Sequence, residues 1–187
     1  MSSKILVLPG DGIGVEVADQ AIRVIEKLNE QGLNASYEKD LVGGASYDVN
    51  GEPLTNSVLE KAKNSDAVLL GAVGGSKWDD VERSKRPEAG LLGLRKELEL
   101  FANLRPALVF DALVSASTLK NEVVNNLDIM IVRELTGGVY FGQPRGIEDT
   151  PNGKKAIDTQ IYYDYEIDRI ARVCLLYTSP SPRDPNR

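Results

Sequence analysis

Short apolar runs alternate with amphipathic stretches along the first half of the chain. The run Lys4–Pro9 is closed by a glycine-rich turn and predicts a buried strand. Apolar residues then recur at helical spacing and predict a helix that ends near Gly32: Ala18, Ala21, Ile22, Ile25 and Leu28. Two further strands are expected at residues 35–40 and 66–72, and Thr55 is expected to cap a helix that runs to Lys63. This alternation predicts an α/β fold whose sheet is at least partly parallel.

The middle of the chain is less regular. Residues 43–54 are rich in glycine and asparagine, and we expect a loop there. Residues 90–106 predict a helix that ends before Arg105, because a residue that precedes proline disfavours α geometry. A weak domain boundary is expected near Leu100, where the strand–helix alternation gives way to the motif NLRP.

The last third of the chain holds one strongly apolar segment. LDIMIVRE (127–134) predicts a buried strand, and the glycine-punctuated residues 136–146 predict a hairpin-like pair of short extended pieces. Helical spacing then returns at Tyr163, Ile167, Ile170, Ala171 and Cys174.

Composition and charge narrow the class of protein. The 187 residues carry a net charge of −6, which argues against a nucleic-acid partner, because such partners require the neutralisation of phosphates. No apolar run is long enough for a membrane span and no signal peptide is evident, so we expect a cytoplasmic protein without a membrane partner. Histidine is absent and Cys174 is the single cysteine, so acid–base chemistry would fall to carboxylates, lysine or tyrosine.

The motif LPGDGIG (8–14) lies between a predicted strand and a predicted helix. Glycines there allow backbone N–H groups to approach a ligand at the positive end of a helix, although a tight strand-to-helix turn would explain them equally well. The spacing differs from the dinucleotide fingerprint G-x-G-x-x-G, and the lysine of a P-loop is missing.

Three arginines form the second candidate constellation: Arg95, Arg105 and Arg133. Arg133 follows the apolar run directly, at the strand end where open α/β sheets bind ligands. Guanidinium groups match carboxylates bidentately, so three of them would suit a di- or tricarboxylate, although each alone could be a solvated side chain. Tyr140 in GGVYFG is either a packing residue or, near such arginines, a general acid.

Four motifs together carry a family resemblance: LPGDGIG, GAVGGSKWD, RPEAGLLGLRKELELFANLRP and IVRELTGGVYFGQPRG. Over residues 4–173 the chain resembles the isocitrate/isopropylmalate family of β-decarboxylating dehydrogenases, and within it the isopropylmalate branch. The resemblance implies NAD-dependent oxidation and β-decarboxylation of 3-isopropylmalate with Mg²⁺ or Mn²⁺, by a homodimer.

The resemblance also implies roles for individual residues. The malate carboxylates would be bound by Arg95, Arg105 and Arg133, the isopropyl group by Leu91 and Leu92. Tyr140 would protonate the enolate carbon after loss of CO₂, and Glu88 would lie near both substrate and nicotinamide. The remaining cofactor contacts on the nicotinamide side would be Ile13, Ala72, Val73, Gly74 and Gly75.

The fold that the resemblance implies has two α/β domains that share one sheet, and it differs from a Rossmann fold. Residues 1–100 would begin the first domain and residues 101–173 the second, with an arm at residues 136–158 that interlocks with a partner subunit. The catalytic lysine, the metal-binding aspartates and the segment that distinguishes NAD from NADP would follow residue 173. We therefore expect a truncated version of the fold, no metal ligand in this chain, and no activity from this chain alone.

Residues 174–187 need a separate interpretation. CLLYTSPSPRD looks like the translation of a transposon-end adaptor used in DNA library preparation, so we expect a non-native tail. A short proline-rich extension is the alternative.

Two other functions remain open. One is a relative that acts on isocitrate, homoisocitrate or tartrate, although apolar Leu91 and Leu92 favour an alkyl group where an isocitrate enzyme would need a polar residue. The other is a carboxylate-binding module without catalysis, which would not need Tyr140. Val15 departs from the proline that many members have at this position, but proline is not required in a first helical turn.

Overall fold

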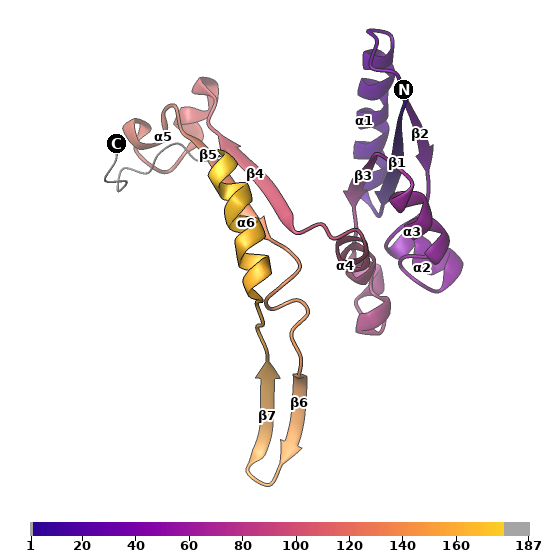
Figure 1. Ribbon diagram of the computed structural model, residues 1–187, viewed down its shortest axis with the longest axis vertical. Coiled ribbons are helices and arrows are strands. Elements are labelled where there is room, and N and C mark those ends of the chain that lie inside the picture. The colour runs from indigo at the N-terminus through magenta and orange to yellow at the C-terminus, as the bar shows by residue number, and fades with distance from the viewer. Residues whose placement is uncertain (1, 178–187) are drawn as a thin grey trace. The chain divides into compact units, whose positions relative to one another are not determined.

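The structure is a computed structural model that describes residues 2–177. The chain divides into two compact units, residues 1–99 and residues 100–187 (Figure 1). The first unit contains β1 (Ser3–Gly10), α1 (Ile13–Asn29), β2 (Ala35–Lys39), α2 (Gly44–Asn50), α3 (Asn56–Lys63), β3 (Ala67–Ala72), the 3-10 helices η1 (Ser76–Trp78) and η2 (Arg83–Lys85), and α4 (Pro87–Glu97). The second contains β4 (Ala102–Leu108), the 3-10 helix η3 (Asp111–Ala116), α5 (Asn121–Val124), β5 (Asp128–Glu134), β6 (Arg145–Thr150), β7 (Gly153–Asp158) and α6 (Asp164–Tyr177).

Three parallel strands in the order β2-β1-β3 form the sheet of the first unit. The central strand β1 pairs with both neighbours, so that Ile5 lies opposite Tyr37 on one side and Ala67 on the other. The expected parallel α/β arrangement is confirmed in this unit. Because parallel strands end at the same edge, the turns that follow β1 and β3 lie next to each other.

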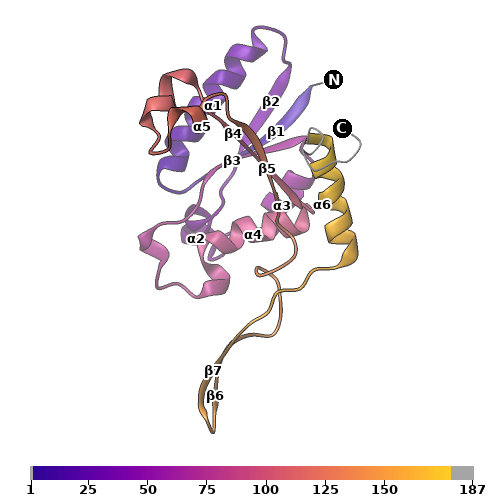
Figure 2. The same ribbon diagram turned by 90° about the vertical axis from the view of Figure 1, so that its left-hand side faces the viewer.

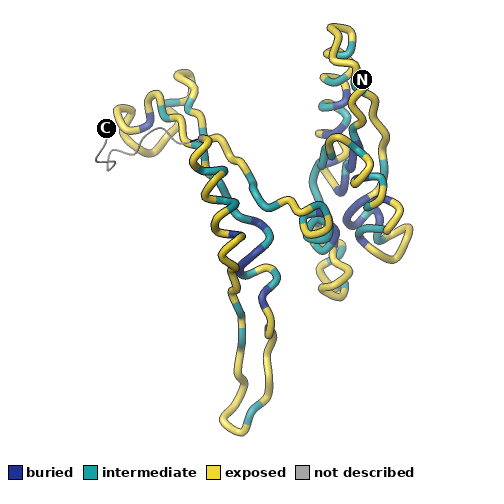
Figure 3. The backbone as a smooth tube through the Cα atoms, viewed as in Figure 1, coloured by how far each residue is buried: buried dark blue, intermediate teal, exposed yellow. Residues whose placement is uncertain are grey.

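Side chains of β1 alternate between two cores, as the period of a strand requires. Val7 packs on one face with Ala18 and Ile22 of α1. Leu6 and Leu8 face the other side, where the buried core continues through Val42, Val58, Ala62 and Leu94. Figure 3 shows buried segments of the first unit along β1 and its helices. Helices therefore cover both faces of the sheet.

The opposite side of α1 carries an exposed apolar stripe of four residues: Ile13, Val17, Val24 and Leu28. Their exposed fractions range from 42% to 61%, and their spacing of four and seven residues puts them on one helical face. Such a face is typical of a surface that another element covers.

Local signals explain the helix boundaries in the first unit. The backbone N–H of Val58 donates to Thr55 Oγ1 at 3.3 Å, so the predicted cap of α3 is confirmed. Pro87 opens α4, where its fixed φ and missing N–H are tolerated.

Two predictions for the middle of the chain are wrong in part. Residues 43–54 include helix α2, which a composition of glycine, serine, aspartate and asparagine does not favour by itself. The helix predicted over residues 90–106 ends at Glu97, and strand β4 follows and includes Pro106. Proline is accepted there because β4 pairs with β5 alone among the described strands.

In the second unit, β4 and β5 form an antiparallel ribbon and α6 packs against β5. The prediction of a buried strand at residues 127–134 is only partly right, because Ile129 and Ile131 are about half exposed at 47% and 50%. A strand with one neighbour, covered mainly by α6, cannot bury both faces.

The hairpin of the second unit is formed by β6 and β7, which pair from Arg145 with Asp158 to Thr150 with Gly153. It lies almost wholly after the predicted position at residues 136–146, where the structure has turns and an isolated bridge between Gly138 and Ile161. Figures 2 and 3 show it as a separate ribbon with little burial.

Helix α6 runs four residues past Val173, to Tyr177. The first part of the expected non-native tail is therefore helical, and residues 178–187 lie outside the described part of the chain. Within residues 2–177, no helix combines the length and apolarity that crossing a membrane requires.

Candidate functional site

The GDGIG turn connects the end of β1 to the start of α1, beside the end of β3. Gly10 has φ of +73°, and a Cβ there would overlap the Ala72 carbonyl oxygen. A Cβ on Gly14 would overlap the carbonyl oxygen of Pro9. These positions need glycine because two backbone segments approach closely. Gly12 differs, since its φ is +53° but a Cβ would meet no atom within 4 Å.

Asp11 occupies the centre of this turn and is only 4% exposed. Its Oδ2 accepts hydrogen bonds from the backbone N–H groups of Gly44 and Gly74, both at 2.8 Å, and its Oδ1 accepts one from Ala45 at 2.7 Å. The sequence analysis did not single out Asp11. The available signal was an acidic residue between two glycines directly after a buried strand, where its carboxylate can accept backbone N–H groups.

The residues with predicted nicotinamide contacts lie at the same edge of the sheet. Ile13 is the first residue of α1 and is 61% exposed. Ala72 ends β3 and residues 73–75 follow it, and Gly74 has φ of +108°. A Cβ built on Gly74 would lie 2.6 Å from Glu88 Oε1, so the structure brings Glu88 against this backbone.

Helix α4 has one packed face and one half-exposed face. Pro87, Gly90 and Leu94 are buried, and Gly90 lies against the backbone of Pro53. The predicted substrate residues occupy the other side at helical spacing: Glu88, Leu91, Leu92 and Arg95. Leu91, Leu92 and Arg95 are half-buried, so apolar groups and a cation share one helical face.

The other two arginines lie in the second unit, on the β4–β5 ribbon. Asn103 lies opposite Arg133, and Arg105 lies opposite Ile131. Because opposite residues and alternate residues share a face, both arginines project from the same face of the ribbon. Arg105 Nε also donates to Asn103 Oδ1 at 2.6 Å, a contact that the sequence analysis did not predict.

Tyr140 lies against Arg133. The Arg133 guanidinium donates a hydrogen bond to the Tyr140 hydroxyl oxygen, and its carbon lies 5.5 Å from the centre of the ring. Tyr140 as a residue is 38% exposed. The structure therefore brings together a cation and a hydroxyl group that can donate a proton, beside a second arginine.

A partly buried carboxylate fixes the turn between Arg133 and Tyr140. Glu134 Oε2 accepts hydrogen bonds from the N–H groups of Thr136 at 2.9 Å and Gly137 at 2.8 Å. Arg169 lies 3.5 Å from its other oxygen and also donates to the Thr136 hydroxyl. Burial acts to raise the pKa of Glu134, but these hydrogen bonds and Arg169 outweigh it and lower that pKa.

The GDGIG turn of the first unit suits an anionic ligand. The turn is open at Gly12, and the N-terminus of the 17-residue helix α1 favours anionic groups such as phosphate. A metal has no comparable candidate, since residues 2–177 contain no cluster of three or more metal-ligating side chains among His, Cys, Asp and Glu.

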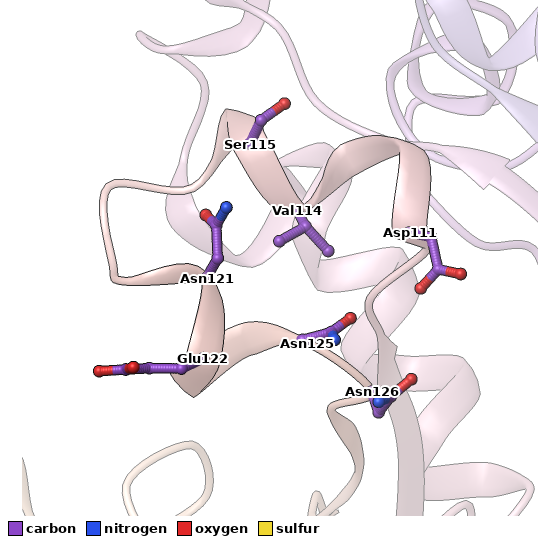
Figure 4. A pocket seen from close by; sticks show the side chains of 7 residues that line it. All are labelled: Asp111, Val114, Ser115, Asn121, Glu122, Asn125 and Asn126. Atoms are coloured by element: carbon purple, nitrogen blue, oxygen red, sulfur yellow. The ribbon is translucent and has the colours of Figure 1, made fainter.

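A hollow of about 470 Å³ in the second unit contains none of the predicted site residues (Figure 4). It lies between η3 and α5, is open to solvent, and is lined mainly by amide and carboxylate side chains. The Glu122 side chain points away from the others in Figure 4. The side chains thus do not converge on a point where a ligand would be held.

Comparison with known proteins agrees with the fold and the motifs. The family model of the isocitrate/isopropylmalate dehydrogenases matches residues 4–185, which runs past residue 173, where we predict the resemblance to end. A 3-isopropylmalate dehydrogenase from Chromohalobacter salexigens is 60% identical over 174 residues, 92% of this chain and 48% of that protein. One from Rhodopseudomonas palustris is 61% identical over 172 residues, 91% and 46% of the two chains.

A solved structure with lower sequence identity has a similar fold. The β-decarboxylating dehydrogenase from Thermococcus kodakarensis superposes with a TM-score of 0.65 at 32% identity, over 93% of this chain and 45% of that one. The chain spans about half the length of the curated relatives it matches. With a family match over nearly its whole length, the chain belongs to the isocitrate/isopropylmalate dehydrogenase family.

Proposed function

We propose that this chain is the first part of an NAD-dependent 3-isopropylmalate dehydrogenase. The complete protein would oxidise and decarboxylate (2R,3S)-3-isopropylmalate to 4-methyl-2-oxopentanoate in leucine biosynthesis. The name shared by relatives that are about 60% identical supports this substrate. The single structural observation that carries the proposal is the pair of Arg133 and Tyr140, on the ribbon that also presents Arg105.

In this proposal, the predicted arginines and leucines bind the substrate. Arg95, Arg105 and Arg133 would bind the two carboxylates of the malate group. Leu91 and Leu92 would contact the isopropyl group. The half-buried apolar face of α4 supports that contact, because a hydrated carboxylate would be unfavourable against two leucines.

Tyr140 would be the proton donor in the step that follows loss of CO₂. After loss of CO₂ the enolate carbon needs a proton, and the Tyr140 hydroxyl group would donate it. The phenolate that remains would be stabilised by the guanidinium of Arg133, which already donates to that oxygen. NAD, when bound, supplies the acceptor for the hydride, and Ile13, Glu88 and residues 72–75 would hold its nicotinamide side.

The other parts of the site would come from residues outside those described. The catalytic lysine and the aspartates that hold Mg²⁺ or Mn²⁺ are expected after residue 173. No residue of this chain is proposed as a metal ligand.

We also propose that the complete protein is a homodimer whose arm includes the β6–β7 hairpin. The hairpin is a two-stranded ribbon with Ile147 72% exposed, and isolated two-stranded hairpins are marginal in water. A partner subunit would supply the missing contacts.

Substitution of Tyr140 by phenylalanine in the complete protein tests the proposed chemistry. Loss of a general acid should lower kcat for isopropylmalate by about 10²- to 10⁴-fold, with little change in the KM for NAD. Tyr163→Phe is the matched control, because Tyr163 is exposed and stacks on Tyr165 in the same unit. A Tyr140→Phe enzyme with the kcat of the control would contradict the assignment.

A related substrate is the main alternative. An isocitrate, homoisocitrate or tartrate enzyme would use the same arginines and tyrosine, but Leu91 and Leu92 would then face a polar group. A binding module without catalysis would show no turnover of any of these substrates, with or without Tyr140.

A further inference from the structure

A buried carboxylate joins three segments at the edge of the sheet where the nicotinamide is proposed to bind. Asp11 accepts N–H groups from Gly44 and Ala45, the first two residues of α2, and from Gly74 after β3. Its own N–H donates to the Ala72 carbonyl oxygen at 2.6 Å. One residue thus links the turn after β1, the start of α2 and the turn after β3.

The surroundings of the carboxylate leave little room for rearrangement. Gly43 has φ of +75°, and a Cβ there would lie 2.6 Å from Asp11 Oδ2. A Cβ on Gly44 would overlap the Trp78 ring. A buried carboxylate that accepts three N–H groups makes stronger hydrogen bonds than a neutral acceptor, and removal of one oxygen leaves a buried donor unsatisfied.

Gly74 connects this carboxylate to the candidate cofactor residues. Its N–H donates to Asp11, and a Cβ built on its Cα would lie 2.6 Å from Glu88 Oε1. A shift of Gly74 therefore changes its spacing to Glu88 directly. The hydrogen bonds described above all join Asp11 to backbone groups.

We propose that Asp11 is a positioning residue for the cofactor: it holds the Gly74 backbone beside Glu88 without contacting the nicotinamide itself. This inference rests on the proposed function for the identity of the cofactor. It adds a residue whose role is to set the geometry of the nicotinamide-facing turn.

The test compares Asp11→Asn with Ser46→Ala in the complete protein. Asparagine keeps one acceptor oxygen and turns an NH₂ group toward a backbone N–H, so Gly74 or the start of α2 must move. The KM for NAD should rise about tenfold or more, while the KM for isopropylmalate changes less than about twofold. Ser46 is fully buried on α2 and donates to the Glu52 carbonyl oxygen at 2.8 Å, so its loss should lower thermal stability without raising the KM for NAD.

If Asp11→Asn does not fold, a second variant tests the proposal. Gly74→Ala retains Asp11 but pushes the turn away from Glu88, and it should raise the KM for NAD in the same way. An unchanged KM for NAD in either folded variant, or an equal rise in Ser46→Ala, would overturn the proposal.

Calorimetric titration with NAD separates this claim from the proposed function. If the wild-type protein binds NAD but does not oxidise isopropylmalate, the proposed substrate is wrong, and weaker NAD binding by Asp11→Asn still supports the positioning role. Equal NAD affinity of the variant and wild type would refute that role whatever the substrate is.

Discussion

Replacement of Gly10 by alanine tests the close approach of β1 and β3, which places the two turns of the candidate site side by side. Gly10 and Gly12 both have positive φ, +73° and +53°, so alanine is strained at either position. Only at Gly10 does the added Cβ also collide, with the carbonyl oxygen of Ala72. Gly12→Ala is therefore a control that shares the backbone strain but lacks the collision.

The expected difference follows from the contacts. Backbone strain should cost about 1–3 kcal/mol at each position. Gly10→Ala must also push Ala72 away, which adds about 1–3 kcal/mol for overpacking. That shift breaks the hydrogen bond from the Asp11 N–H to the Ala72 oxygen, worth about 0.5–1.5 kcal/mol. We expect Gly10→Ala to be less stable than Gly12→Ala by about 2–4 kcal/mol.

The assay is urea unfolding of the two variants and wild type in the complete protein, followed by circular dichroism and by enzyme activity. Gly10→Ala should show the lower midpoint by both signals, with an unchanged slope. Equal destabilisation by the two substitutions would mean that a Cβ at residue 10 is accommodated. The described approach of β1 to β3 would then be wrong.

Three further predictions concern specificity, pH and the isolated chain. Leu91→Ser should lower kcat/KM for isopropylmalate by about 10- to 200-fold, whereas Val49→Ser, at an exposed position, should have no effect. The pKa of Glu134 is lower in the folded state than its ordinary value. The ionised carboxylate therefore stabilises the fold above the ordinary glutamate pKa, and this contribution is lost as pH falls through the lowered pKa. Glu134→Gln should flatten the fall in unfolding free energy below about pH 4.3. The 187-residue chain alone should bind a hydrophobic dye through the exposed apolar stripe of α1 and unfold without a sharp transition, and a sharp transition without dye binding would contradict this.

Local sequence patterns were sufficient to predict the elements that bury their own apolar side chains on the sheet. The apolar run of β1 and the helical spacing of α1 predicted these elements because both bury their apolar side chains on the sheet, and Thr55 predicted the start of α3 as its cap. The same rule failed for β4, because apolar spacing carried over from α4 and Pro106 indicated only where the helix must end. Its pairing with β5 is a long-range contact that local spacing does not encode.

Tertiary hydrogen bonds explain why helix α2 was not predicted, and exposure explains why strands β6 and β7 were not. Helix α2 has a poor helical composition, but Asp11 accepts its first N–H groups and Ser46 is bonded to Glu52. The strands β6 and β7 are mostly exposed on both faces, so no alternation of apolar and polar residues marks them. The motifs predicted which residues form the candidate site, whereas the role of Asp11 emerged only from its contacts with segments distant in sequence.

The central claim is tested most directly by the rate of NADH formation by the complete protein. Purified protein with NAD and Mn²⁺ would be assayed with 3-isopropylmalate and, in parallel, with isocitrate. We predict a kcat/KM for 3-isopropylmalate that exceeds the value for isocitrate by at least about tenfold, as an apolar contact to the alkyl group allows. Equal or faster turnover of isocitrate, or no NADH with 3-isopropylmalate, would contradict the proposed function.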